Sequence, residues 1–464
     1  MKLRIAGHHH QLLYTHLFPG DGHEAVALAL CGQARSGAGQ AHPDVLTVCR
    51  VEPVPYEFCA VRTPDQVTWA TAQILPELLC EAQKRHLLLL KIHSHPGGWP
   101  KFSRYDDQAD RELFSGVAGW LDVDIPGGSV IMLPDGRLVG RVCDAHGRFL
   151  PLSSIAVAGD EIRVWQAHHG VGELPAYAAR TAQAFGTGTT TLLSRLSVAV
   201  IGCSGTGSPL IEMLARLGVG ELVLVDPDVV EAKNLNRIYN TTAEDAHQQR
   251  YKANVLAAAV TRMELGTRVV PIANSLFDPQ VVRRVAQCDV VFGCMDSVDG
   301  RALLNRLATF YVLPYIDVGV RLIADGQQGI SQICGSVHYL QPGSSSLFTR
   351  GVYTSEQLRA AGMYRADPDA YRDQLQQGYI QGVAEERPAV ISVNSFYASL
   401  AVNEFLARLH PFRDDPNRDY ATVTFSLSQM RLISEEDGPT DEALAREVGR
   451  GDIVPLLNRP ELSE

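Results

Sequence analysis

Residues 197–226 read SVAVIGCSGTGSPLIEMLARLGVGELVLVD. This stretch predicts a strand, a glycine-rich turn, a helix and a second strand, which together open a doubly wound parallel sheet. Further strands are expected at 269–272, 289–294 and 311–319, an apolar helix at 389–410 and a late strand at 421–427. The fold class of this part of the chain is therefore α/β.

A second informative stretch, residues 91–110, reads KIHSHPGGWPKFSRYDDQAD and follows a short apolar strand signal, LLLL. Alternate side chains of a strand share a face, so His93 and His95 point the same way. Asp106 follows eleven residues after His95. Two imidazoles and a carboxylate supply three zinc ligands and leave a fourth position for water, which favours a catalytic over a structural site.

Composition limits the class of protein. The 464 residues are 45% apolar and 20% charged, typical of a soluble globular protein with two or three domains. The net charge of −11 argues against nucleic-acid binding, and no apolar run or signal peptide indicates a membrane. Nine scattered cysteines without a C-x-x-C pair indicate reduced thiols in a cytoplasmic protein.

The pattern divides the chain into four segments. Residues 1–155 are expected to form one α/β domain, and 156–190 a turn-rich linker. Residues 191–412 hold the second domain, interrupted by an irregular polar excursion at 341–388. Residues 413–464 are expected to be a peripheral acidic extension.

Each half of the metal motif also has a purely structural interpretation. Ser103-x-x-Asp106 can be the start of a helix, with Ser103 as its N-cap. A lone H-x-H can be two polar residues at a strand end. The combination, with Pro96 behind the second histidine and a glutamate upstream, is more specific than either half.

This combination resembles the JAMM metallo-isopeptidase family, whose pattern is a distant Glu, H-x-H-P, six residues and S-x-x-D. The resemblance covers residues 1 to about 150 and implies a JAMM-type α/β metallohydrolase domain. It implies that His93, His95 and Asp106 bind zinc, that Glu24 is the general base, and that Ser103 donates to the oxyanion.

The spacing does not fix the glutamate, because Glu52 and Glu57 also precede the histidines. The flanking sequence LFPGDGHEAVALALCG resembles the prokaryotic strand of the family and favours Glu24.

The loop after the strand at 197–201 carries the nucleotide signal. Its glycines allow close approach of a phosphate, and Asp226 ends the next strand, where a carboxylate can accept from ribose hydroxyls. These residues alone suit NAD and ATP equally. The cations Arg237 and Lys252 and the later carboxylate Asp296 favour a triphosphate with Mg²⁺. Surface ion pairing of Lys252 and helix capping by Asp296 are the alternatives.

This run resembles the ubiquitin-activating family, including its bacterial ThiF and MoeB relatives, from residue 175 to about 410, and implies a doubly wound Rossmann-like adenylation domain. The implied reaction is attack of a C-terminal glycine carboxylate on the α-phosphate of ATP. The resemblance assigns the nucleotide loop to Gly202, Gly205 and Gly207, ribose to Asp226, phosphates to Asn234, Arg237 and Lys252, Mg²⁺ to Asp296, and an arginine finger reaching across a homodimer to Arg180.

The chain departs from that family in several places. Ser204 stands where glycine is usual, and the C-x-x-C pairs that hold a structural zinc in many relatives are missing. Serines 344–346 occupy the place of the first pair. No cysteine follows Cys334, so the thioester acceptor of some relatives is missing too. The adenylate is therefore expected to pass directly to another protein, or to a hydroxyl such as one of these serines.

The two resemblances together imply a bifunctional enzyme acting on a ubiquitin-like protein that ends in glycine. Zinc, ATP and Mg²⁺ are the implied cofactors, a conjugating-enzyme-like protein the implied partner, and bacterial operons, some linked to phage defence, the implied setting. One alternative is an adenylyltransferase of sulfur-carrier or peptide maturation with a small-substrate zinc peptidase. Another is a binding scaffold with silent sites.

Overall fold

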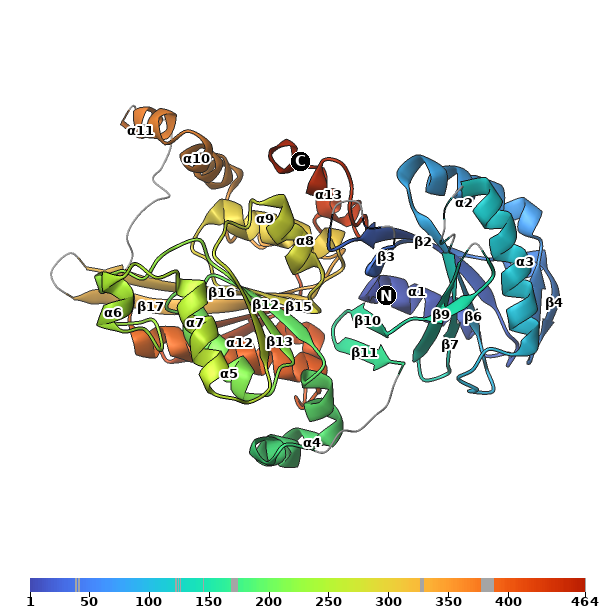
Figure 1. Cartoon of the computed structure of the whole chain (residues 1–464), viewed down its shortest axis with the longest axis horizontal. Helices are drawn as coiled ribbons and strands as arrows, with labels where there is room; N and C mark the ends of the chain where they lie inside the picture. Colours follow the sequence, from blue (N-terminus) through green and yellow to red (C-terminus); the bar gives the residue numbers. More distant parts are fainter. Residues whose placement is uncertain are drawn as a thin grey trace. The chain divides into compact units, whose positions relative to one another are not determined.

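The computed structural model describes residues 1–37, 40, 42–121, 123, 125, 127–144, 146–167, 174–325, 329–376 and 388–463. The chain forms two compact units, and each is described by itself (Figure 1). The first comprises Met1–Gly170, Phe310–Val312 and Glu447–Asn458; the second comprises Val171–Thr309, Leu313–Arg446 and Arg459–Glu464. Part of the predicted linker, residues 168–173, lies outside the described residues.

The first unit is built around a mixed sheet of strand order β11-β10-β1-β3-β2-β6-β7-β8-β9, with a separate hairpin β4-β5. Its elements are β1 Lys2–Ala6, α1 Gly7–Leu17, β2 Val26–Ala34, β3 Val45–Pro53, β4 Cys59–Thr63, β5 Gln66–Trp69, α2 Thr71–Arg85, β6 Leu88–Ser94, α3 Arg104–Leu121, β7 Gly127–Met132, β8 Leu138–Cys143, β9 Phe149–Pro151, β10 Ser154–Ala158 and β11 Ile162–Gln166.

Both faces of this sheet are covered, which explains its uninterrupted apolar strands. In β2, Ala27, Ala29 and Cys31 contribute to the core that also holds α1, whereas Val26 and Leu28 contribute to the core with α2 and α3. The leucine run of β6 alternates in the same way. The face of β6 that carries Leu89 also carries Lys91 and His93, and it is the face that α3 covers.

The structure divides the chain differently from the sequence-based boundaries. Strands β10 and β11 belong to the first sheet, because residues 154–158 pair in parallel with β1. The acidic C-terminal stretch was predicted to be peripheral, but Glu447–Asn458 is part of the first unit. There Gly451 bridges to Gln33 on β2, and Thr47 Oγ1 donates to the Gly449 carbonyl at 2.8 Å.

The second unit contains a sheet of order β14-β13-β12-β15-β16-β17-β18-β19. Its elements are α4 Ala179–Leu193, β12 Ser197–Ile201, α5 Gly207–Arg216, β13 Glu221–Val225, α6 Ala243–His247, α7 Lys252–Arg262, β14 Arg268–Ile272, α8 Pro279–Ala286, β15 Val290–Gly293, α9 Val298–Phe310, β16 Tyr315–Ala324, β17 Ile330–Leu340, α10 Ser355–Ala366, α11 Pro368–Gln376, α12 Ile391–Leu409, β18 Thr422–Ser426, β19 Arg431–Glu435 and α13 Glu442–Ala445.

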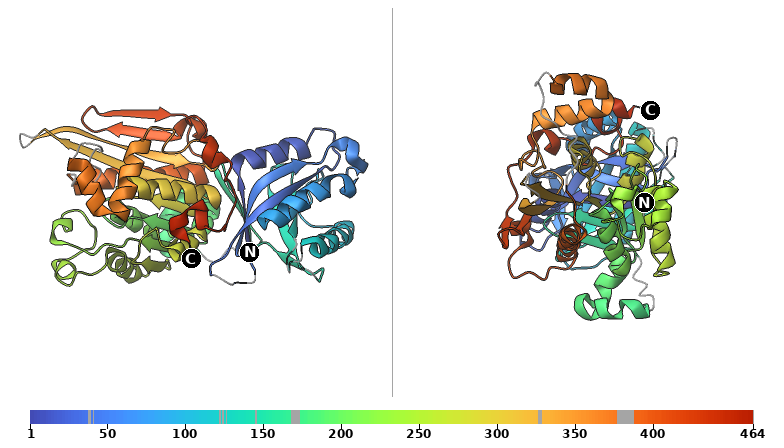
Figure 2. Two further views of the ribbon diagram at one scale, coloured as in Figure 1. Left: turned by 90° about the horizontal axis from the view of Figure 1, so that it is seen from above. Right: turned by 90° about the vertical axis from the view of Figure 1, so that its left-hand side faces the viewer.

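In the order of the sheet, the five strands β14, β13, β12, β15 and β16 are parallel to one another. From β17 onward, each strand is antiparallel to the one before it. Crossover helices cover such parallel strands, so β12, β13 and β15 are buried, whereas β19 at the edge is exposed along its whole length. Figure 1 shows α5 and α7 in front of the strands, and Figure 2 (left) shows the orange-red strands β18 and β19 at the edge of the sheet. The parallel strands carry their carboxyl ends to one edge, where ligands bind in such folds.

Two further expectations differ from the structure. The predicted strand at 311–319 begins at Tyr315, because Phe310–Val312 belongs to the first unit. The segment 341–388 was expected to be irregular, but its described part contains the helices α10 and α11. Thr354 caps the start of α10, and α11 begins at Pro368, and the polar composition of the segment did not reveal either start. No helix in the described ranges is long and apolar enough to cross a bilayer.

Candidate functional site

The metal motif lies where β6 ends and α3 begins. Backbone pairing fixes the end of β6 beside β2, since Ser94 N donates to the Ala25 carbonyl at 3.0 Å and Ser94 Oγ accepts from Ala25 N at 2.9 Å. Glu24, which precedes Ala25, is in turn held by its N–H to the Thr63 carbonyl on the β4–β5 hairpin, at 2.8 Å. The residues that the sequence placed at this site therefore come together from three segments.

The three predicted ligands converge in the structure. Nε2 of His93 lies 3.1 Å from Nε2 of His95 and 3.1 Å from Oδ1 of Asp106. One candidate ligand atom from each residue falls within 4.8 Å of the others, and all three residues are buried. The fourth predicted residue is adjacent, with Glu24 Oε1 at 3.8 Å from His95 Nε2. The rival Glu52 instead pairs with Arg50 on β3, at 2.8 Å.

The electrostatics of the cluster follow from burial and mutual contact. Burial lowers the pKa of His93 to about 4 and raises that of Glu24 to about 7, although His95 opposes the second shift. Burial works against protonation of His95 as well, but Asp106, the Trp99 carbonyl and Glu24 together raise its pKa. For Asp106, the two rings outweigh burial and hold its pKa far below the ordinary value. Neutral imidazole and ionised carboxylate are the forms that bind a cation.

One contact at this site was not predicted from the sequence. His95 Nδ1 lies 2.8 Å from the Trp99 carbonyl, so its N–H can point there and leave the Nε2 lone pair toward the other ligands. A hydrogen bond from Nδ1 to a main-chain carbonyl fixes the tautomer of a metal-binding histidine. The signal in the sequence was only the turn-forming Gly97-Gly98 between the two residues, because a main-chain acceptor has no side-chain signature.

Ser103 is the N-cap of α3, which is the structural interpretation of the S-x-x-D motif. Its hydroxyl donates to Asp106 Oδ2 at 2.8 Å and accepts from Asp106 N at 3.1 Å, the reciprocal pattern of a helix N-cap. Its N–H also donates to Oδ2, at 2.7 Å. The serine thus orients the Asp106 carboxylate, and donation to an oxyanion requires the hydroxyl to give up this bond.

The glycines of the loop after β12 are required by close contacts with neighbouring protein atoms. Gly202 has φ of +98°, which disfavours any side chain, and a Cβ there would lie 2.6 Å from the Cys294 carbonyl oxygen. A Cβ at Gly207, the first residue of α5, would overlap the Gly202 carbonyl. Strand β15, which ends just before Cys294, therefore packs directly on the loop.

Asp226 and Lys252 lie beside this loop. Asp226 Oδ2 accepts from Cys203 N at 2.6 Å, so the carboxylate at the end of β13 also holds the loop in place. Burial raises the pKa of Asp226, and Lys252 acts against this shift. Lys252 is 6% exposed and donates to Asp228 Oδ2 at 2.7 Å, so the ion pair of the alternative interpretation is present.

Arg237 and Asn234 arrive from the segment after β13. The Arg237 Cδ atom would lie 3.3 Å from a Cβ placed on Gly205, while its guanidinium donates to the Lys233 carbonyl. The Asn234 amide oxygen accepts from Glu231 N at 3.1 Å in a local cap, so its amide nitrogen is the group left to donate.

Sequence reasoning missed Asn394 on α12. This asparagine is buried, and its amide abuts Gly205 from the other side of the loop. The helix itself was predicted as an apolar element, and one polar residue in it gave no sign of a ligand site.

The last two predicted residues are exposed. Asp296 follows the end of β15 and lies two residues after Cys294, at the same edge of the sheet as the loop. Arg180 lies in the first turn of α4, which is kinked at Gly186. Neither side chain has a hydrogen bond or ion pair with another residue in the described ranges.

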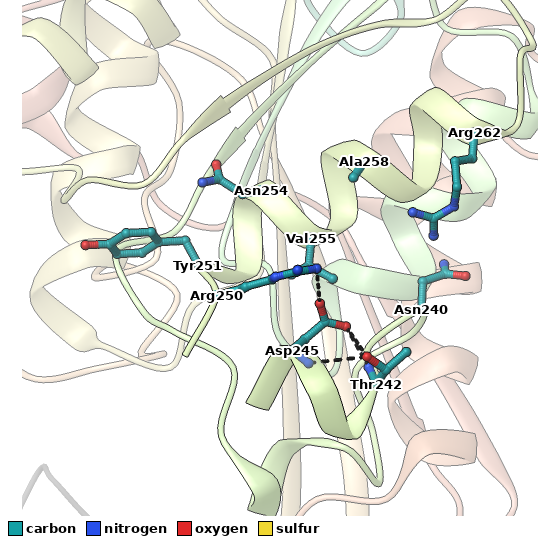
Figure 3. Close-up of a pocket in the computed structure, with 9 residues that line it drawn as sticks. All are labelled: Asn240, Thr242, Asp245, Arg250, Tyr251, Asn254, Val255, Ala258 and Arg262. Carbon is teal, nitrogen blue, oxygen red and sulfur yellow. Dashed lines mark hydrogen bonds and ion pairs between the residues drawn. The ribbon is translucent and has the colours of Figure 1, made fainter. Parts of the chain in front are cut away.

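A cavity of about 540 Å³ opens between α6 and α7 and is shown in Figure 3. It is lined by Asn240, Thr242, Asp245, Arg250, Tyr251, Asn254, Val255, Ala258 and Arg262. Asp245 is already paired with Arg250 and capped by Thr242. None of the predicted nucleotide residues lines this cavity, and we assign it no role.

The serines that replace a C-x-x-C pair form a closed polar cluster. Ser344 and Ser345 both donate to Asp437, and Arg350 Nη2 pairs with Asp437 Oδ1 at 2.8 Å. Although burial raises it, Arg350 and the hydroxyls keep the pKa of Asp437 below its ordinary value. Ser346, 1% exposed, donates to Asp441 at 2.7 Å. These hydroxyls are engaged in structure, which argues against their use as acyl acceptors.

The comparison with known proteins follows the same two-part division. The ThiF family model matches residues 177–438, more than half of the chain, and the model for prokaryotic homologs of the JAB domain matches residues 7–131.

Curated relatives include the adenylyltransferase and sulfurtransferase MOCS3 of Danio rerio, 34% identical over 147 residues, which are 32% of this chain and 31% of that protein. The SAMP-activating enzyme E1 of Haloferax volcanii is 38% identical over 119 residues, 26% of this chain and 43% of that protein. Ubiquitin-like modifier-activating enzyme 5 of Drosophila pseudoobscura pseudoobscura is 25% identical over 273 residues, 53% and 66% of the two chains. The chain thus spans about a third of the length of the first of these.

Among solved structures, the microcin C7 biosynthetic enzyme MccB in complex with N-formylated MccA is similar with a TM-score of 0.46 and 17% identity, over 59% of this chain and 77% of that one. The family assignment rests on the sequence models. The chain belongs to the ThiF family and carries a JAB domain ahead of its ThiF region.

Proposed function

We propose that this chain is a bifunctional enzyme that adenylates the C-terminal glycine of a ubiquitin-like protein with ATP and hydrolyses peptide or isopeptide bonds of the same protein. The observation that carries the proposal is the coexistence, in one ThiF-family chain, of a glycine loop flanked by Asp226 and Lys252 and of a converging His93, His95 and Asp106 set with Glu24 beside it.

The residues of the first unit fit a zinc ion. Three ligand atoms of the kinds that zinc prefers face one another, and the Trp99 carbonyl leaves the Nε2 atom of His95 available. When bound, zinc would polarise a water molecule and the scissile carbonyl. Glu24 is placed to take a proton from that water and to return it to the leaving amine. Ser103 keeps the Asp106 carboxylate oriented throughout.

The second unit fits activation of a carboxylate. The glycine loop and the start of α5 would receive phosphate oxygens, and Asp226 the ribose. A carboxylate oxygen of the terminal glycine attacks the α-phosphorus, the bond to the β-phosphate breaks, and pyrophosphate leaves. Lys252 and Arg237 offset the charge of the phosphates, and Asp296 would hold Mg²⁺. Arg180, exposed and without a partner among the described residues, is proposed to reach the nucleotide of a second copy.

Two assays test the proposal directly. Purified protein should catalyse ATP–pyrophosphate exchange that depends on a β-grasp protein ending in Gly-Gly, and should cleave residues placed after those glycines. Exchange that instead depends on a free amino acid or a short peptide would replace the ubiquitin-like substrate by the maturation alternative. Protein that binds no zinc and shows no exchange with any of these would contradict both activities.

A further inference from the structure

A row of buried polar side chains crosses the first sheet next to the metal site. Lys91 on β6, Ser129 on β7 and Arg141 on β8 are in register, so the three side chains share the face covered by α3. Lys91 is 7% and Arg141 8% exposed. Burying a cation costs free energy of folding unless the cation is paired with an anion. The partners of Lys91 and Arg141 therefore indicate the role of these residues.

The partners are carboxylates on the first two turns of α3. Asp110, which has no exposed surface, accepts from Lys91 Nζ at 2.6 Å and from Arg141 Nη2 at 2.7 Å. Arg141 Nη1 pairs with Asp107. Asp106, the neighbouring carboxylate, points to His93 instead. One short helical segment is thus anchored by two carboxylates to the sheet and offers a third to the metal site.

Aromatic rings enclose the anchor. The Arg141 guanidinium contacts two aromatic rings. It lies 3.7 Å from the centroid of the Phe102 ring and 3.6 Å from that of the Phe149 ring. The Phe102 ring is also 6.2 Å from the His93 ring. The ion pairs on Asp110 are buried, which strengthens them, whereas Asp107 is partly exposed.

We infer that Lys91, Asp110 and Arg141 are positioning residues that hold the start of α3 against β6 and thereby preorganise Asp106 for zinc. This inference rests on the proposed zinc site. None of the three touches the ligand atoms, so their effect acts through the position of Asp106 and through the affinity for the metal. Groups that hydrogen-bond directly to metal ligands change metal affinity by about ten- to a hundredfold, and this range sets the scale for residues that position a ligand from one contact further away.

The test compares zinc affinity with stability. Lys91→Met keeps the aliphatic stem and leaves Asp110 paired with Arg141, so the unit should remain folded. Competition with a chromogenic chelator should show a zinc dissociation constant raised about tenfold or more. Thermal unfolding of the metal-free protein, followed by circular dichroism, measures the purely structural part. Arg50→Met is the control, because Arg50 pairs with glutamates on β3 and α2 of the same unit and with no carboxylate on α3. The zinc affinity of this variant should equal that of the unaltered protein.

A second variant covers the case in which Lys91→Met does not fold. Arg141→Lys keeps one charge but cannot bridge Asp107 and Asp110, and should weaken zinc binding by a smaller factor. An unchanged dissociation constant in a folded variant, while the unaltered protein binds zinc, overturns the positioning role and leaves the proposed function intact. Failure of the unaltered protein to bind zinc overturns both.

Discussion

The two candidate sites of this chain are assembled in opposite ways. The candidate metal site draws His93, His95 and Asp106 from the end of one strand and the first turn of the following helix. The candidate nucleotide site draws on the loop at Gly202, on Asp226 after β13 and on Asn394 of α12. A site drawn mainly from one strand–loop–helix segment depends on local anchoring, whereas a site drawn from distant segments depends on the packing of many elements.

The largest effect is expected when one of the proposed metal ligands is removed. His95→Ala should abolish zinc binding, measured by metal analysis, and lower cleavage by about a thousandfold, since the metal contributes several kcal/mol to the transition state. ATP–pyrophosphate exchange should stay unchanged, because no residue of the second unit is altered. Loss of both activities would show that the two sites are coupled.

The converse change is made in the second unit. Lys252→Ala removes a buried cation beside Asp226 and should lower exchange by about a hundredfold, as the loss of one charge-stabilising donor does. Cleavage should persist. Arg262→Ala is the control on the same helix, since Arg262 is exposed and lines the cavity away from the loop. Equal losses in the two variants would argue against a specific role for Lys252.

A backbone test of the sheet-edge site is Gly207→Ala. The new methyl group would overlap the Gly202 carbonyl, so the loop or α5 must shift. We expect a loss of about 1–3 kcal/mol of stability in urea unfolding, typical of overpacking, together with weaker nucleotide binding. Gly188→Ala on α4, where nothing lies near the added methyl, should leave both unchanged.

The smallest effect is expected at the serine cluster. Ser345→Ala removes a buried hydroxyl that donates to Asp437 and accepts from Arg350. The free energy of unfolding, measured by thermal unfolding, should fall by about 1–3 kcal/mol. Exchange should be unaffected, and so should any covalent labelling by a ubiquitin-like protein. Labelling that disappears only in this variant would restore the serine as an acyl acceptor.

The same difference between local and distant contacts explains which features could be predicted from the sequence. The convergence of His93, His95 and Asp106 was predictable because H-x-H on a strand and S-x-x-D at a helix start fix side-chain directions locally. The glycine loop and Asp226 were predictable from the strand–turn–helix–strand pattern. The α/β fold class and both family resemblances are confirmed by the family models and the structure.

The remainder depends on tertiary contacts. Asn394 approaches Gly205 from a helix almost two hundred residues later, and no local pattern reports such a meeting. The Trp99 carbonyl acts through the main chain. Lys91 and Arg141 looked like ordinary strand residues, since burial of a cation is visible only once its carboxylate partner is in place. The roles of the site residues stay predictions until the variants above are measured.

The segment Glu447–Asn458 has a practical consequence for anyone who wishes to isolate the first unit. A polypeptide ended near residue 170 would lose the strand-like neighbour of Gln33 and the acceptor of the Thr47 hydroxyl, and would leave the Arg4 guanidinium without the Tyr311 carbonyl. Since residues 447–458 complete the first unit, that unit can reach its final form only after this late segment has been synthesised.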